Sequence, residues 1–144
     1  MKKVLFLMMA AVIGSVVLVG CQTADPQPQL QTSTTQTISG TVSYRERIAL
    51  PDEAVVTVTL EDISLADAPA KVIAKHRFMP NGKQVPLAFE LAYDPRKIQE
   101  NHRYNVRAQI EVDGRLRFTT DTIAPVVTDG NKTNVVDLRL VGVR

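Results

Sequence analysis

The sequence predicts an all-β protein: a single antiparallel β-sandwich of about seven strands, preceded by a signal peptide and a disordered tether. Three observations support this prediction. From residue 37 onward, apolar and polar residues alternate with a period of two, which is typical of half-buried strands. Turn-forming residues separate the alternating segments. The first 36 residues lack this alternation and consist of an apolar run followed by a polar stretch.

Residues 1–20 have the composition of a secretory signal peptide. Lys2 and Lys3 give a positive start, and the run from Val4 to Val19 carries no charge. A transmembrane anchor is the alternative interpretation. That run is shorter than the roughly 20 residues that cross a bilayer, and no basic cluster follows it. We therefore predict a signal segment.

The tetrapeptide 18–21, Leu-Val-Gly-Cys, resembles the bacterial lipobox. The resemblance implies cleavage before Cys21 and acylation of this cysteine, and two or more acyl chains hold a protein stably on a membrane. We interpret Cys21 as a lipidation site rather than a nucleophile, because the nearest histidine in the sequence is His76. In the lipoproteins that this segment resembles, Asp after the cysteine favours inner-membrane retention. Gln22 stands at that position, so the resemblance implies an outer-membrane lipoprotein facing the periplasm.

Residues 21–36 are predicted to form a lipidated, disordered tether. The stretch from Gln22 to Gln36 is rich in Gln and Thr, and Leu30 is its single large apolar residue. Such a composition does not bury enough surface to offset its ordering entropy. Its root-mean-square span is roughly 20 Å, and it extends to about 50 Å.

Residues 37–144 are predicted to form the sandwich, with an immunoglobulin-like or transthyretin-like arrangement. The first strand, TISGTVSYR, has Ile38, Val42 and Tyr44 in phase, and VVTVTLE alternates valine and leucine with threonine. The third, KVIAKHRFM, is weaker because both of its faces carry apolar residues. The segments expected to be strands are 37–45, 55–61, 71–79, 85–93, 104–112, 115–118 and 134–143.

The later segments follow the same logic. VPLAFELAY, YNVRAQIEV and NVVDLRLVGV each place apolar residues on one face, and a short helical turn is expected at DPRKIQEN, with Pro95 as its first residue. The Asp113-Gly114 pair is typical of a two-residue hairpin turn. That register places Leu116 on the polar face. We therefore predict a three-residue loop with a bulge at Gly114, which pairs Ile110 with Leu116.

Composition excludes several classes of function. A single cysteine excludes an intramolecular disulfide framework and a multi-cysteine metal site. Lys2 and Lys3 account for the formal charge of +2, since the remaining basic and acidic residues balance. A neutral domain without Trp is a poor candidate for nucleic-acid binding. We expect no metal, no cofactor and no nucleic-acid partner.

The titratable residues give no catalytic constellation. Neither His76 nor His102 has a His or Cys at ligand spacing; His76 is predicted to be a partly buried strand residue and His102 a turn or capping residue. Asp52-Glu53 and Glu61-Asp62 are adjacent carboxylates, which point to opposite faces if they lie on strands, and are expected in solubilising turns. We predict that the protein is not an enzyme.

Four arginines are candidates for a binding patch on the outer face of the hairpin: Arg103, Arg107, Arg115 and Arg117. Such a patch suits lipid phosphates or an acidic partner segment. An ordinary solvated sheet face is the alternative interpretation, because exposed charge commonly finishes a sheet.

Two blocks, Gly40–Phe78 and Phe89–Thr122, resemble the YbaY/YscW family of bacterial lipoproteins. The most specific pieces are Gly40-Thr41-Val42, the strand LPDEAVVTVTLED, and YDPRKI with HRYNVRAQI. The resemblance implies a small lipoprotein without known catalysis. Some members resemble pilotins, chaperones that help a secretin ring reach the outer membrane.

Two hypotheses for the function follow. The first is a non-catalytic, pilotin-like binding or chaperone module with the membrane and a secretin-like outer-membrane protein as partners. The alternative is a structural or envelope-stress surface lipoprotein that has no tight protein partner.

Overall fold

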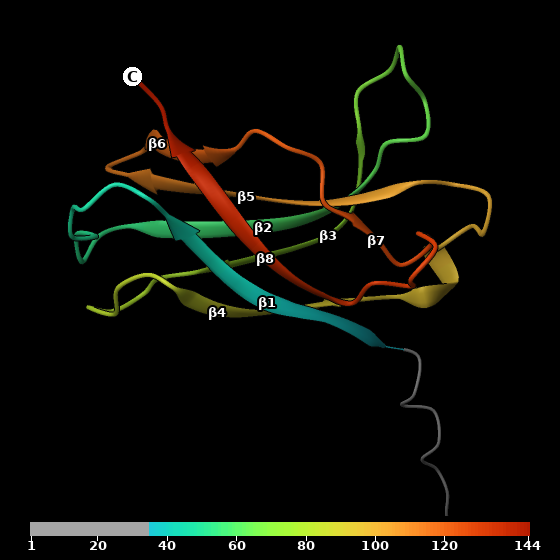
Figure 1. The fold of residues 1–144 in the computed structure, drawn as a ribbon, viewed down its shortest axis with the longest axis horizontal. Helices are drawn as coiled ribbons and strands as arrows, with labels where there is room; N and C mark the ends of the chain where they lie inside the picture. The colour runs from blue at the N-terminus through green and yellow to red at the C-terminus, as the bar shows by residue number, and fades with distance from the viewer. Residues whose placement is uncertain (1–34) are drawn as a thin grey trace, which may run out of the picture. The chain divides into compact units, whose positions relative to one another are not determined.

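The computed structural model describes residues 35–144 (Figure 1). The predicted signal peptide, Cys21 and most of the tether lie outside the described residues. The first strand begins at Gln36, which pairs with Tyr93, so the last residue of the expected tether already belongs to the domain. Within the described part of the chain, no helix is long and apolar enough to cross a membrane.

Eight strands and one short 3₁₀ helix make up the domain. They are β1 (Gln36–Tyr44), β2 (Val55–Asp62), β3 (Lys71–Phe78), β4 (Leu87–Tyr93), η4 (Pro95–Lys97), β5 (Tyr104–Val112), β6 (Arg115–Thr120), β7 (Pro125–Val126) and β8 (Val135–Gly142). All seven predicted strands are present, and the two-residue β7 is an addition. The predicted helical turn is confirmed as η4, whose N-cap Asp94 accepts a hydrogen bond from the Arg96 amide.

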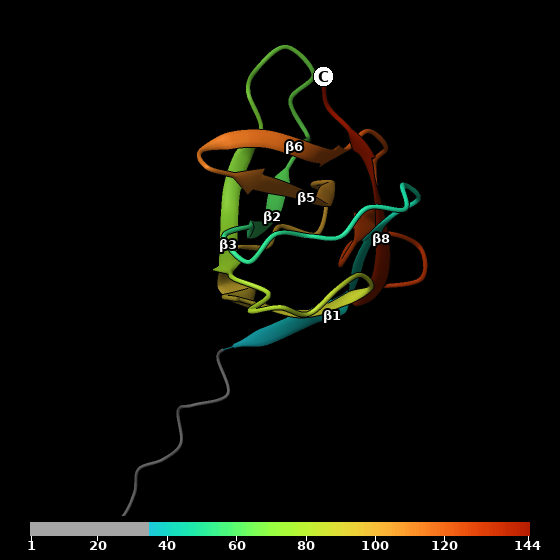
Figure 2. The ribbon, with the colours of Figure 1, turned by 90° about the vertical axis from the view of Figure 1, so that its left-hand side faces the viewer.

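The strands form one continuous hydrogen-bonded sheet in the order β3-β2-β5-β6-β8-β1-β4, with β7 paired to the start of β5. The sheet curls until its end strands, β3 and β4, lie side by side, giving a nearly closed barrel (Figure 2). The all-β class is confirmed, whereas the two separate sheets of a sandwich are not. The strand β1 explains the difference: it pairs with β4 on one edge and with β8 on the other, which joins the parts that a sandwich keeps apart.

The core lies inside this barrel, and most of its residues are inward residues that the alternation predicted; Leu50, Ala54 and Val126 come from outside the predicted strands. Val56, Val58 and Leu60 of β2 are fully buried, and the ring of Tyr44 stacks on Phe118 at 4.1 Å between centroids. The other core residues are Ile38, Val42, Leu50, Ala54, Leu87, Phe89, Leu91, Tyr104, Val106, Ala108, Ile110, Val126, Leu138 and Leu140.

The predicted hairpin register is wrong. The turn has two residues, Asp113 and Gly114, both with positive φ, as in a type I′ turn. The register shifts farther along the ladder, where Ile110 pairs with Phe118 rather than Leu116. This bulge turns Phe118 into the core and leaves Leu116 exposed, so it corrects the phase of Phe118 but not that of Leu116.

The strands β1 and β8 run parallel and approach closely at Gly40. Gly40 pairs with Val136 and has a φ of +157°. A Cβ added to Gly40 would lie 1.6 Å from the carbonyl oxygen of Val136. The backbone of β8 therefore occupies the space that any side chain would need.

Candidate functional site

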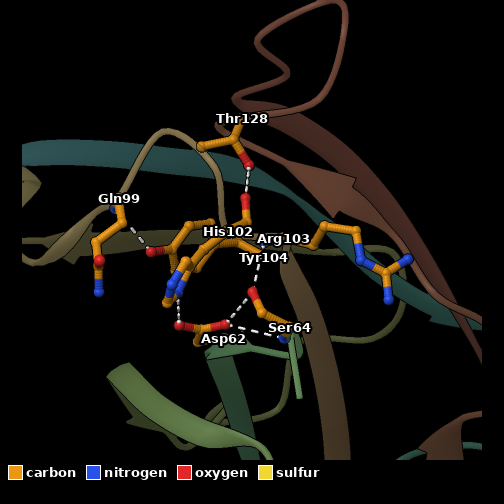
Figure 3. A network of polar contacts seen from close by, with 7 residues as sticks. All are labelled: Asp62, Ser64, Gln99, His102, Arg103, Tyr104 and Thr128. Atoms are coloured by element: carbon orange, nitrogen blue, oxygen red, sulfur yellow. Dashed lines mark hydrogen bonds and ion pairs between the residues drawn. The ribbon is translucent and has the colours of Figure 1, made fainter. Parts of the chain in front are cut away.

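A network of polar contacts fixes one end of the barrel, where β2 ends and β5 begins (Figure 3). Asp62, the last residue of β2, accepts hydrogen bonds at Oδ1 from the hydroxyl of Ser64 at 2.6 Å and from its amide at 3.0 Å. The other oxygen, Oδ2, lies 2.6 Å from Nδ1 of His102. The carboxylate thus joins two connections of the chain that are 40 residues apart.

The same network continues through the backbone. The amide of Arg103 donates to the Ser64 hydroxyl at 2.8 Å, and the hydroxyl of Thr128 donates to the His102 carbonyl at 2.6 Å. The amide of Gln99 donates to the Tyr104 hydroxyl at 2.9 Å. Three connections, which follow β2, η4 and β7, are therefore held against one another.

The protonation of Asp62 is set by these contacts. Desolvation raises the pKa of this carboxyl, but the hydrogen bonds from Ser64 and His102 outweigh desolvation, so the pKa of Asp62 lies below its ordinary value. The ionised form is the one that accepts all three hydrogen bonds. The network therefore needs an ionised Asp62.

Asp, Ser and His meet here without the geometry of a nucleophilic triad. Ser64 donates its hydroxyl proton to Asp62 and accepts from the Arg103 amide. A nucleophilic serine instead needs a base that takes its proton, with the histidine between serine and carboxylate. The arrangement acts as a structural clamp on the loop that starts at Ile63.

We expect the free energy of unfolding to decline as pH falls through the folded-state pKa of Asp62. The unfolded chain, in which this pKa is about 4, binds more protons than the folded chain in that range, so acid favours unfolding. Asp94 and Asp129 have pKa values lowered in the same direction, by Arg96 and by Thr133.

The variant Asp62→Asn measures how much Asp62 contributes to the acid dependence of the free energy of unfolding. It should lower the free energy of unfolding near neutral pH by about 1–3 kcal/mol and weaken the decline in acid. Urea titrations between neutral and acidic pH measure both effects. An unchanged acid dependence in the variant would contradict the assignment.

The clamped loop, residues 63–70, projects from the barrel (Figure 1, upper right). Residues 65–70 are all exposed, and Leu65 has 71% of its surface exposed. Pro69 restricts the backbone of the loop. One exposed leucine is common on a protein surface, so the loop becomes a candidate contact surface only together with the apolar residues near its base.

A hollow of about 230 Å³ lies at the base of this loop. Its apolar lining includes Ile63, Pro125 and Ile123, and Ile123 is 63% exposed. Arg103 and Asp129 supply opposite charges at its rim. Apolar lining with a few polar groups suits an apolar segment that also presents a polar contact.

The structure distributes the four candidate arginines over different surfaces. Arg103 lines this hollow, and Arg107 extends outward from β5, with its guanidinium 3.9 Å from Glu61. Arg115 lies at the hairpin turn, and Arg117 lines a separate hollow. The prediction that all four arginines share one face depended on the hairpin register, which was wrong. A binding role for any one of these residues stays a prediction.

The other singled-out residues lie as follows. His76 is exposed on β3 and stacks on Phe78, so its predicted partial burial is wrong. His102 does lie in a turn, as predicted, but its contact with Asp62 was missed. Glu61 and Asp62 do point to different partners; they end β2 instead of forming a solubilising turn. The motif Asp62-Ile63-Ser64, typical of an Asx turn, was the available signal.

Three comparisons relate the chain to known proteins. The family model described as type III secretion system lipoprotein chaperone (YscW) matches residues 33–140. The uncharacterized lipoprotein YbaY of Escherichia coli (strain K12) is 45% identical over 121 residues, which are 84% of this chain and 61% of that protein. The chain thus spans less than two thirds of that relative. A solved structure, an alternative pilotin from the type II secretion system of Vibrio cholerae, is 64% identical with a TM-score of 0.75, covering 76% of this chain and 98% of that one.

Proposed function

The chain belongs to the family of type III secretion system lipoprotein chaperones (YscW), and from this membership we propose that it is a lipid-anchored, non-catalytic, pilotin-like chaperone for a secretin-type protein. One observation carries the proposal: the 64% identity to a protein described as a pilotin, over 98% of that chain. Identity at this level, along nearly the whole of that chain, supports a shared mode of action.

The anchor forms the second part of the proposal. Acylated Cys21 holds the domain at the periplasmic face of the outer membrane, and the tether lets the domain move within about 50 Å of the bilayer. A relative described as a lipoprotein supports the lipid anchor. A tethered chaperone meets a membrane-bound partner at a raised effective concentration.

We place the contact with the partner at the loop 63–70 and the hollow beneath it. Leu65 and Ile123 offer apolar surface that folding leaves uncovered. Arg103 at the rim suits an acidic residue in the partner segment. The occupant that fits is an apolar segment of the secretin-type protein with an acidic residue beside it.

Strand addition at a sheet edge is less favoured as the docking mode. The two edge strands, β3 and β4, approach each other without hydrogen-bonding, so each limits access to part of the edge of the other. The strand β3 also carries Lys71, Lys75 and Arg77, and charge of this kind blocks edge pairing. The projecting loop is the more accessible surface.

In-cell photo-crosslinking from position 68, three residues after Leu65 on the same loop, tests the proposal. The full lipidated chain should capture a secretin-type outer-membrane protein, identified by mass spectrometry. Leu65→Ser should reduce the yield of this product about tenfold, since truncating a central apolar anchor removes much of the binding energy. Cys21→Ser should remove the membrane fraction of the protein and the product together.

The matched control is Val135→Ser, which changes an apolar residue that is 63% exposed on β8, outside the loop 63–70. Its yield should equal that of the unmodified chain. If only abundant bystanders are captured in every case, the chaperone proposal fails and a structural envelope lipoprotein is favoured. Equal losses with Leu65→Ser and Val135→Ser would contradict the placement at the loop.

A further inference from the structure

The outer face of β3, β2 and β5 has an ordered arrangement of hydroxyl and cationic side chains. Cross-strand pairing places Thr57 beside Arg77 and Gln109, and Thr59 between Lys75 and Arg107. Figure 2 shows these three strands as neighbours in the barrel wall. The sequence alone did not predict that Lys75 and Arg107 lie on one face, because their strands, β3 and β5, are not consecutive in the chain.

These side chains enclose a hollow on the outside of the barrel. It has a volume of about 230 Å³ and is lined by Thr57, Thr59, Glu61, Val72, Lys75, Arg107, Ala108 and Gln109. Thr57 and Thr59 form its floor, and only 8% and 9% of their surfaces are exposed, although they point away from the core. The long side chains on the flanking strands account for this burial. The threonine hydroxyls are thus polar groups at the bottom of a recess.

Positive charge exceeds negative charge at this place. Lys75 and Arg77 form no ion pair within residues 35–144. Among residues 35–144, the side-chain partners of the Arg107 guanidinium are a distant carboxylate, Glu61 at 3.9 Å, and a hydroxyl, Thr119, at 3.5 Å. Among the residues that line the hollow, the two cations Lys75 and Arg107 stand against one carboxylate, Glu61, and Arg77 lies two positions from Lys75 on β3. Like charges that flank one residue repel each other unless an anion lies between them.

We propose that this hollow binds a phosphate group. A phosphate offers several acceptor oxygens, which match the guanidinium of Arg107, the ammonium of Lys75 and the hydroxyls of Thr57 and Thr59. The group belongs either to a lipid headgroup or to a free phosphate ion, and the chemistry of recognition is the same. This site is separate from the loop 63–70, so it does not depend on the chaperone function.

The test is an NMR titration of the full chain with two soluble probes at constant ionic strength. The probes are inorganic phosphate and glycerophosphoglycerol, a phospholipid headgroup without acyl chains. We expect saturable shifts of the amides of Thr57, Thr59 and Arg107. Saturation with glycerophosphoglycerol at lower concentration assigns a lipid headgroup, and the reverse order assigns a free phosphate. Absence of saturable shifts with both probes overturns the proposal.

Variants decide whether these side chains form the site. The double variant Lys75→Gln/Arg107→Gln should weaken binding at least about tenfold, because it removes two charge-assisted contacts. The control Lys83→Gln/Arg115→Gln removes the same charge from residues outside the hollow and should leave binding within about twofold. Thr59→Val, which keeps the shape of the strand residue, should also weaken binding. Equal losses in both double variants would show general charge attraction and overturn the proposal.

Discussion

Replacing Gly40 with alanine should lower the free energy of unfolding by at least about 3 kcal/mol, the upper range for overpacking. The new Cβ would lie 1.6 Å from the Val136 carbonyl oxygen. The obstacle is backbone rather than the end of a flexible side chain, so no rotamer change relieves it. Relief requires β1 and β8 to separate, which breaks their parallel hydrogen bonds.

Urea unfolding of Gly40→Ala beside Gly130→Ala measures this effect. Gly130 is the matched control, because a Cβ there meets no atom within 4 Å. We expect Gly130→Ala to remain within about 0.5 kcal/mol of the unmodified chain. If Gly40→Ala behaves in the same way, the close approach of β1 and β8 is not a fixed feature of the fold.

Leu60→Ala is the second change with a large expected effect, a loss of about 2–5 kcal/mol in the free energy of unfolding. Leu60 is fully buried in the core of the barrel. Truncation removes apolar contacts and leaves a cavity, which the surrounding strands fill only partly because each is fixed by hydrogen bonds on its neighbours. The barrel should lose stability as a whole.

Leu65→Ala is the control for this prediction, since it makes the same chemical change on the exposed loop. Its free energy of unfolding should differ by no more than about 0.5 kcal/mol, while its capture of the partner declines. Urea unfolding of Leu60→Ala and Leu65→Ala distinguishes a core role from a surface role. The midpoint should fall for Leu60→Ala alone, with the dependence of the free energy on denaturant unchanged in both variants. A destabilised Leu65→Ala would mean that the loop packs on the domain and is not free to bind.

The strands could be predicted from sequence because alternation is a local property. Val56, Val58 and Leu60 are in phase in the sequence and lie together in the core. Barrel closure could not be predicted in this way, because it depends on β1 pairing with both β4 and β8. The prediction of the hairpin register was wrong for a related reason. A bulge within β6 corrects the phase of Phe118, and no residue type in β6 is typical of a bulge.

Less of the candidate site than of the fold could be predicted from the sequence. The Asp62-Ile63-Ser64 turn is local, so the sequence could have predicted it. The contact of Asp62 with His102 could not be predicted in this way, because it joins residues 40 positions apart. The predicted arginine patch depended on the wrong hairpin register. The four arginines were therefore expected on one face, whereas the structure distributes them over several surfaces. Family resemblance succeeded where spacing could not, since the matching family model covers residues 33–140.

The pairing of β1 with β8 also sets an order of events during folding. The strand that leads the domain hydrogen-bonds to the strand that ends it, from Ser39 with Val135 to Tyr44 with Leu140. Contacts between such distant parts of a chain form late, because closing the long intervening loop is entropically unfavourable. While the chain is still emerging, β1 has no partner on that edge, and the barrel stays open. The strand next to the tether can pair with β4 earlier, but we expect its second edge to be covered only when β8 is in place.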